Sequence, residues 1–266
     1  MHNQNLVVLV GPAVDVTSFI ATSDASLEAL KTANLLKGLP VNAFIFGQNG
    51  TGKKSLAKYI LPNAPIVDAS MYDELEGTLS SHKTIIISNF DKMPNFDNFK
   101  ALVDKYEVRI IALANSIFNV DVIDKFFGIK VSLPPLSERQ EDVKALAEHF
   151  LHEARILFDT NEDIDIDITR INLENNAHSV RRYIYMKVQF QSVSEAELMD
   201  LTETFLRDKI GGNSDYRNFI YLYEAPLINA GLQKYKTQFQ LSDKLGLNRN
   251  TLRKKIAENK EYLNHE

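Results

Sequence analysis

One stretch decides the fold of this chain: Phe44-Ile45-Phe46-Gly47-Gln48-Asn49-Gly50-Thr51-Gly52-Lys53-Lys54-Ser55. The apolar run before the glycines predicts a strand, the glycines predict a tight loop, and the residues after Lys53 predict a helix. A strand, a glycine-rich loop and a helix in this order form a phosphate-binding loop, in which backbone N–H groups, the helix dipole and a lysine meet one anion. We therefore expect the following nucleotide-binding residues: Gly47, Asn49, Gly50, Thr51, Gly52, Lys53 and Lys54.

Composition sets the broad class of the protein. The chain has 266 residues with 44% hydrophobic content, enough for two or three domains, and it has no cysteine. The lack of cysteine excludes a disulfide scaffold and a thiolate metal site. We find no apolar run of about 18 residues and no basic region ahead of the short apolar run at residues 6–10. We therefore expect a cytoplasmic protein that does not enter membranes.

The charge is distributed unevenly along the chain. The formal net charge is −5, yet the stretch from Leu232 to Lys260 holds eight Lys and Arg against two acids, or +6, which leaves −11 for the rest. An acidic body with a basic C-terminal segment predicts a polyanionic partner for that segment alone.

Hydrophobic runs alternate with helical patterns over the first 135 residues, which predicts an α/β domain with a parallel sheet. The expected strands are 6–10, 43–46, 66–68, 84–87, 108–113 and 129–133. An amphipathic helix over 141–158 begins a helical lid, and the chain is helical from Ser192 onward. We expect three domains, at residues 1–137, 138–191 and 192–266.

The segment between the lid helices alternates acids and isoleucines. Asp163, Asp165, Asp167 and Glu174 have the spacing of a calcium loop, but Ile168 stands where that loop needs glycine. We expect an acidic connection here and no metal site.

Five segments resemble, in order, the AAA+ domain of NtrC-type bacterial enhancer-binding regulators; they are 47–53, 83–94, 108–115, 133–143 and 179–181. The most specific match is Val131-Ser-Leu-Pro-Pro-Leu-Ser-Glu-Arg-Gln-Glu-Asp-Val143. The resemblance covers residues 17–190 and implies a P-loop that holds ATP or ADP, with Mg²⁺ left open. It places Asn115 and Arg181 at nucleotide-sensing positions. In the alternative reading, Asn115 only caps a loop and Arg181 is a surface residue of a lid helix.

The C-terminus resembles the Fis-type helix-turn-helix that ends the same regulators, from Glu224–Ile228 to Leu247–Ile256. This resemblance implies double-stranded DNA as partner and a homodimer formed by the helices over 194–235. Apolar residues 241, 245, 247, 252 and 256 would face a core, with Gly246 in the turn. The expected DNA-binding residues are Asn248, Arg249, Asn250, Thr251, Arg253, Lys254 and Lys255. A basic helix face without a DNA role is the alternative.

Three features of the family are absent. Ser88 stands where the family has the Asp that orients the Mg²⁺ shell, and Asn89 stands where it has the Glu that activates water. Lys125 stands where the family has an arginine finger. Only 15 residues separate Asp68 from Thr84, with no G-A-F-T-G-A sequence that would bind the alternative sigma factor.

We therefore predict a sequence-specific DNA-binding transcription regulator whose AAA+ domain binds nucleotide at most. It would not act on the alternative sigma factor. Two alternatives stay open: an ATPase that uses unorthodox residues such as Asp91 with Lys125, or a nucleotide-free AAA+ scaffold for protein interaction.

Overall fold

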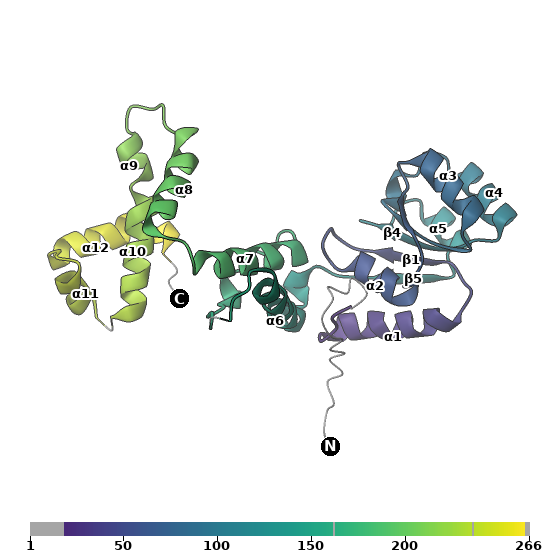
Figure 1. Cartoon of the computed structure of the whole chain (residues 1–266), viewed down its shortest axis with the longest axis horizontal. Helices are drawn as coiled ribbons and strands as arrows, with labels where there is room; N and C mark the ends of the chain where they lie inside the picture. Colours follow the sequence, from purple (N-terminus) through teal and green to yellow (C-terminus); the bar gives the residue numbers. More distant parts are fainter. Residues whose placement is uncertain (1–18, 162, 236, 264–266) are drawn as a thin grey trace, which may run out of the picture. The chain divides into compact units, whose positions relative to one another are not determined.

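A computed structural model describes residues 19–161, 163–235 and 237–263 (Figure 1). The chain forms two compact units, and the boundary between them lies between Ser192 and Val193. The strand expected at residues 6–10 lies outside the described residues.

The described part of the first unit contains a five-stranded parallel sheet in the order β2-β3-β4-β1-β5. Its strands are β1 Ala43–Phe46, β2 Ile66–Asp68, β3 Thr84–Ser88, β4 Arg109–Ala114 and β5 Ile129–Ser132. The central strand β1 lies between β4 and β5, with Ala43 opposite both Ile111 and Ile129. The strands β1, β3 and β4 are buried along almost their whole length, as unbroken apolar runs predict, whereas β5 leaves Lys130 and Ser132 exposed.

Helices cover both faces of the sheet, and they are α1 Asp24–Gly38, α2 Lys53–Ile60, α3 Tyr72–Ser81, α4 Phe96–Tyr106 and α5 Val120–Phe126. On one face, α1 and α2 bury Leu36 and Leu56 against Ile111. On the other face, α3, α4 and α5 pack around an aromatic cluster in which the Phe90 ring lies 5.3 Å from that of Phe127. Ser23 caps α1, because its side chain accepts a hydrogen bond from the Ser26 N–H.

The lid consists of α6 Gln140–Leu157 and α7 Ala177–Phe190, which pack through Val143, Ala147, Val180 and Ile184. In the described residues of the acidic connection between them, the structure has only the short 3₁₀ helix Ile168–Arg170. No group of three or more metal-ligating side chains occurs among the described residues.

The second unit is built of helices, namely α8 Glu195–Arg207, α9 Asp215–Phe219, α10 Tyr221–Lys234, α11 Gln238–Lys244 and α12 Arg249–Glu258. The last three share a small core around Ala225, Ile228, Leu241 and Leu252. Helix α8 contains no buried residue. None of the helices in the described ranges is long and apolar enough to cross a membrane.

Candidate functional site

The glycine-rich loop lies at the carboxyl end of β1 and leads directly into α2. Gly47, Gly50 and Gly52 have φ values of 152°, 77° and 100°. Residues other than glycine rarely adopt such values. A Cβ at Gly47 would stand 2.2 Å from the Leu133 carbonyl oxygen. The loop therefore needs its glycines both for conformation and for close approach to the neighbouring chain.

Lys53 is the first residue of α2, and its side chain folds over the loop. Its Nζ donates to the carbonyls of Gly47 at 2.5 Å and Gln48 at 2.7 Å, and to Asn115 Oδ1 at 3.3 Å. The backbone N–H groups of Gly50, Gly52 and Lys53 have no partner within the described residues. Lysine, sensor-position asparagine and free N–H groups thus converge as an anion site requires.

Burial lowers the pKa of Lys53 from 10.5 to about 8. The charge of Asp91 opposes this shift, and that of Lys54 adds to it. A bound phosphate would favour the charged ammonium and raise this pKa again.

The end of β3 carries the positions that would activate water in the family. Ser88 is buried and donates its hydroxyl to the Val67 carbonyl at 3.2 Å. Asn89 donates to Asp68 Oδ2 at 2.6 Å. The pKa of Asp68 lies below its ordinary value because Ser70 and Asn89 hydrogen-bond to its carboxylate. Neither Ser88 nor Asn89 is a base near neutral pH.

Asp91 lies one turn further, in the short 3₁₀ helix Phe90–Lys92. Its Oδ1 is buried and has no hydrogen-bond partner among the described residues. This carboxylate is also close enough to Lys53 to influence its titration.

Asn176 joins the lid to the glycine-rich loop. Its Nδ2 donates to the Asn49 carbonyl at 2.8 Å and to Gln48 Oε1 at 3.3 Å, and its Oδ1 accepts from the Leu136 N–H at 2.7 Å. The residue is 1% exposed and has φ 50° and ψ −129°. Such a conformation is costly for any residue but glycine, and here three hydrogen bonds hold it.

A buried ion pair lies behind the loop. Arg139 donates through Nη2 to the Thr51 carbonyl at 2.8 Å and through Nη1 to Asp142 Oδ2 at 3.3 Å. Asp142 also accepts hydrogen bonds from residues at the start of α1, namely Thr22, Ser23 and Ser26. Burial opposes its ionisation, but these hydrogen bonds outweigh burial and hold its pKa below the ordinary value.

Arg181 lies within the lid and makes no described contact with the loop. Its Nη2 pairs with Glu153 at 2.7 Å, and the same nitrogen donates to the Tyr185 hydroxyl at 3.2 Å. These contacts raise its pKa. Arg181 thus lies beside Glu153 and Tyr185 in the lid, whereas Asn115 Oδ1 accepts a hydrogen bond from Lys53. The nucleotide-sensing roles of both residues stay predictions.

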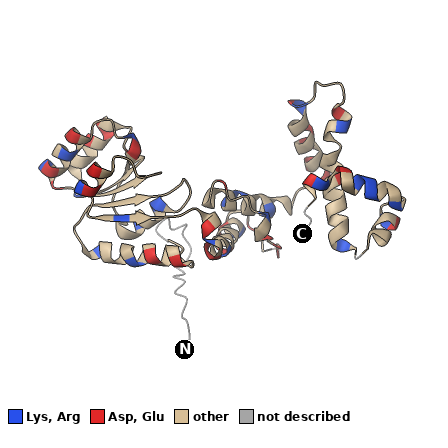
Figure 2. Ribbon diagram, turned by 180° about the vertical axis from the view of Figure 1, so that it is seen from behind, with Lys and Arg blue, Asp and Glu red and all other residues tan. Residues whose placement is uncertain are grey.

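In the second unit, α11 and α12 meet at a tight turn that contains Gly246 at φ 65°. Asn248 caps α12 by accepting from the Thr251 N–H at 2.8 Å. Arg249, Asn250, Arg253 and Lys254 are exposed, and Figure 2 shows the basic residues along this helix.

Lys255 departs from the expected outer face of α12. Its Nζ forms an ion pair with Glu224 of α10, whose other oxygen lies 3.4 Å from Asn259 Nδ2. The pair is only partly exposed and ties α12 to α10. We therefore separate Lys255 from the other basic residues of the helix.

Comparisons with known proteins show which proteins this chain is similar to. No protein-family model matches it. It is 24% identical over 339 residues to the DNA-binding transcriptional regulator NtrC of Azospirillum brasilense, covering 93% of this chain and 70% of that protein. NtrC of Escherichia coli K12 is 23% identical over 202 residues, covering 56% and 42%. The chain is therefore similar in sequence to NtrC-type AAA+ regulators.

Solved structures support the fold of the AAA+ unit. NtrX of Brucella abortus in complex with ADP matches with a TM-score of 0.57 and 18% identity, covering 92% of this chain and 70% of that one. The same protein in complex with ATP matches with a TM-score of 0.56 and 15% identity. The expected α/β AAA+ P-loop domain with a parallel sheet is thereby confirmed.

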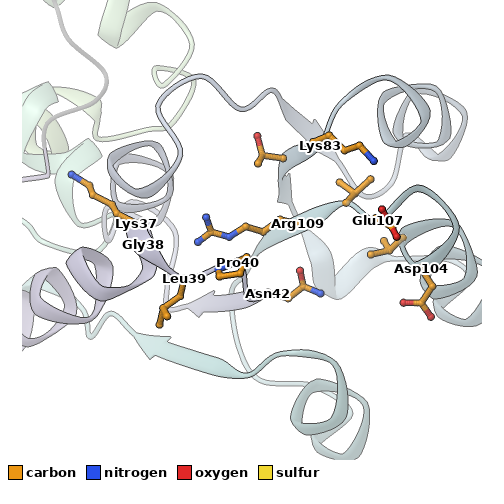
Figure 3. A pocket seen from close by; sticks show the side chains of 12 residues that line it. Lys37, Gly38, Leu39, Pro40, Asn42, Lys83, Asp104, Glu107 and Arg109 are labelled. Carbon is orange, nitrogen blue, oxygen red and sulfur yellow. The ribbon is translucent and has the colours of Figure 1, made fainter.

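A groove of the AAA+ unit lies at the opposite edge of the sheet, where the strands begin (Figure 3). It has a volume of about 860 Å³ and contains Lys37, Lys83 and Arg109. Arg109 donates to the Leu36 and Val41 carbonyls, and Lys83 donates to the Tyr106 carbonyl. Two of the three cations therefore cap the C-terminal ends of α1 and α4, where the helix dipole favours positive charge.

The sequence analysis predicted no role for Asn176, Arg139 or Asp142. Arg139 and Asp142 lie in the most specific motif of the AAA+ resemblance, so a signal was present. Asn176 has none, because an asparagine in a polar stretch is ordinary until the lid is folded against the loop.

Proposed function

We propose that the chain is a sequence-specific DNA-binding transcription regulator. The observation that carries this proposal is the exposed basic face of α12, presented after a tight turn and supported by α10 and α11. The similarity to NtrC proteins, whose name describes DNA binding, supports the same function.

The arrangement of α11 and α12 suits a recognition helix. Leu241 and Leu252 are fully buried, and Leu247 packs beside them, so the two helices are fixed relative to each other. The Leu247 N–H donates to the Ser242 carbonyl at 2.9 Å and closes the turn. A helix-turn-helix held this way presents the first turn of its second helix to base edges in the major groove.

Replacing Arg249 and Lys254 together by alanine should weaken DNA binding strongly and reduce its dependence on salt. Each lost phosphate contact should lower the slope of log K against log salt by about 0.9, and a lost base contact should cost about 1–3 kcal/mol. Fluorescence anisotropy with a selected duplex at several salt concentrations would measure both. Alanine at Lys100 and Lys144, two exposed lysines of the AAA+ unit, removes the same charge and should change little. Equal loss in both double variants would contradict the assignment.

We further propose that the regulator is a homodimer formed through α8. Leu198, Leu201 and Phe205 follow one face of this helix and are 44%, 53% and 49% exposed. An apolar face at helical spacing that stays exposed in the described part of its unit suits a second copy of the same helix. A dimer would also set two α12 helices on neighbouring half-sites of a duplex.

Leu201→Asp should convert the dimer to a monomer, because it places a charge within the apolar face. Light scattering after size-exclusion chromatography would report the mass. Ala196→Asp adds the same charge near the first turn of α8, where the helix dipole tolerates acids, and should leave the mass unchanged. A wild-type chain that is monomeric at micromolar concentration would exclude this dimer.

We propose that the AAA+ unit binds ATP or ADP without turning it over. The convergence of Lys53, Asn115 and free N–H groups supports binding, and solved NtrX complexes with both nucleotides support the same placement. Ser88 and Asn89 support the absence of turnover. Titration calorimetry with ATP and ADP, with and without Mg²⁺, tests this: binding that Lys53→Ala abolishes supports a sensor, and no binding supports a scaffold.

Nucleotide affinity should fall as the pH rises through about 8, the pKa of free Lys53. Below that pH the lysine is already charged, whereas above it each binding event must take up a proton because phosphate raises the pKa. Calorimetry at pH 7 and pH 9.5, in buffers with different ionisation enthalpies, would show both the loss and the proton. Lys53→Arg keeps its charge and should bind equally at the two pH values.

A second candidate function is ATP hydrolysis with Asp91 as the base. Its buried, unpartnered oxygen and its proximity to Lys53 favour it over any other acid at this edge. Steady-state phosphate release that Asp91→Asn abolishes and Lys54→Ala preserves would establish this function.

The connection between β2 and β3 bears on the sigma factor. It consists of the single uninterrupted helix α3 with short turns at either end, leaving no inserted loop. We therefore propose a regulator that does not engage the alternative sigma factor.

A further inference from the structure

Phe239 is an exposed aromatic residue at the start of α11, the first of the two helices that meet at Gly246. It lies in the first turn of α11, and its side chain is 62% exposed. Thr237 caps this helix by accepting from the Gln240 N–H at 3.2 Å, so the first turn is well defined. A large apolar side chain at this place contributes little to the core and needs another explanation.

The guanidinium of Arg249 lies over the ring of Phe239 in a cation–π contact. The Cζ of Arg249 lies 5.5 Å from the ring centroid. Stacking on an aromatic ring uses the face of the guanidinium and leaves its N–H donors free in the plane. No hydrogen bond or ion pair engages these donors within residues 237–263 or elsewhere in the described chain.

The helices on either side make this pair a fixed arrangement. Phe239 and Arg249 belong to the first turns of two helices that are locked by buried Leu241 and Leu252. An arginine on a flexible stem loses rotamer entropy when it binds, and a ring that already holds it reduces that loss.

The two side chains have complementary preferences for bases. A planar guanidinium donates to O6 and N7 of guanine, and an aromatic ring packs against the methyl group that only thymine presents in the major groove. Their contact distance allows them to meet bases next to each other.

We propose that Phe239 and Arg249 form one recognition unit that reads a guanine with an adjacent thymine in duplex DNA. This inference rests on the proposed DNA-binding function. Arg249 contacts the guanine, while Phe239 positions Arg249 and packs on the thymine methyl group.

The test begins with selection of duplexes from a randomised library by the whole 266-residue chain. We expect enrichment of guanine with thymine beside it. Selection is repeated with Phe239→Leu, which keeps apolar volume but has no aromatic face, and with Phe239→Tyr, which keeps the face. The leucine variant should show a weaker preference for guanine over other bases, and the tyrosine variant should keep the preference of the wild type.

The second step uses the enriched duplex with its thymine replaced by deoxyuridine, which removes only the methyl group. The wild type should bind this duplex about threefold to fourfold more weakly, as expected for one buried methyl. Phe239→Ala should bind both duplexes equally, and its overall affinity should be a further twofold to fivefold lower because the stacked arginine is lost. Circular dichroism checks that the helices remain, which the exposure of Phe239 leads us to expect.

The outcomes are distinct. If the wild type enriches no sequence, the proposed DNA-binding function fails. If it enriches a site that Arg249→Ala no longer recognises, while Phe239→Leu selects the same bases and deoxyuridine costs nothing, DNA binding stands and the inference is overturned.

Discussion

Asp142→Ala should lower the free energy of unfolding of the AAA+ unit by about 3–5 kcal/mol. Arg139 and Asp142 have side-chain exposures of 2% and 1%, so removing the carboxylate leaves a guanidinium buried without its counter-charge. The variant also strands the N–H groups of Thr22 and Ser23, which lose their acceptor. Because buried donors without an acceptor are also destabilising, we expect the upper part of this range.

Urea unfolding followed by circular dichroism measures this change. Asp124→Ala is the matched control, because it removes an aspartate from the exposed pair with Lys130 and should cost no more than about 1 kcal/mol. Combining Asp142→Ala with Arg139→Leu should recover part of the loss, since the unpaired charge is gone. A single variant as stable as the Asp124→Ala control would show that Asp142 does not support the fold.

The same carboxylate makes stability depend on pH. Its pKa in the folded protein lies below the ordinary value, so its contribution is complete above the ordinary aspartate pKa of about 4 and is lost as the pH falls through the folded pKa. The wild type should therefore lose more stability in acid than Asp142→Ala does.

Gly47→Ala should destabilise the AAA+ unit by about 3 kcal/mol and abolish nucleotide binding. The new Cβ would stand 2.2 Å from the Leu133 carbonyl oxygen and 3.1 Å from Thr51 Oγ1, at a φ of 152°. The first contact is to backbone, so relief requires the loop or the chain after β5 to move. The strained conformation adds about 1–3 kcal/mol of its own.

Gly77→Ala supplies the matched control. Gly77 lies inside α3, and a Cβ there would meet no atom within 4 Å. Alanine is the better helix former by about 1 kcal/mol, so this variant should be slightly more stable and bind nucleotide normally. Thermal melting and calorimetry with ADP compare the two; unchanged binding in Gly47→Ala would contradict the close packing of the loop.

Local chemistry explains why much of the AAA+ unit was predictable. A strand buried on both faces needs an apolar run, and a loop that curls its N–H groups inward needs glycine, so both leave direct marks in the sequence. The five described strands follow from apolar runs, and the α6 helix follows from its amphipathic pattern. The convergence of Asn115 on Lys53 follows once parallel strands place their carboxyl ends at one edge.

Side-chain partners across elements were not predictable in this way. Lys255 has the same local setting as Lys254, yet it pairs with Glu224 because α10 lies against that face of α12. Arg181 pairs with Glu153 for a similar reason within the lid. A periodic pattern shows which face of a helix is apolar, but it does not show which charged residue of a neighbouring element lies against the other face.

The sequence by itself therefore determined the phosphate-binding loop, the parallel α/β core and the basic character of the last helices. These depend on residue type at short spacing, where backbone conformation and hydrophobic burial dominate. Only the tertiary structure decided that Asn176 holds the lid to the loop, that Arg139 and Asp142 are buried together, and that Phe239 carries Arg249. Each of these is a contact between residues of different elements, and its strength comes from the burial or geometry that packing creates.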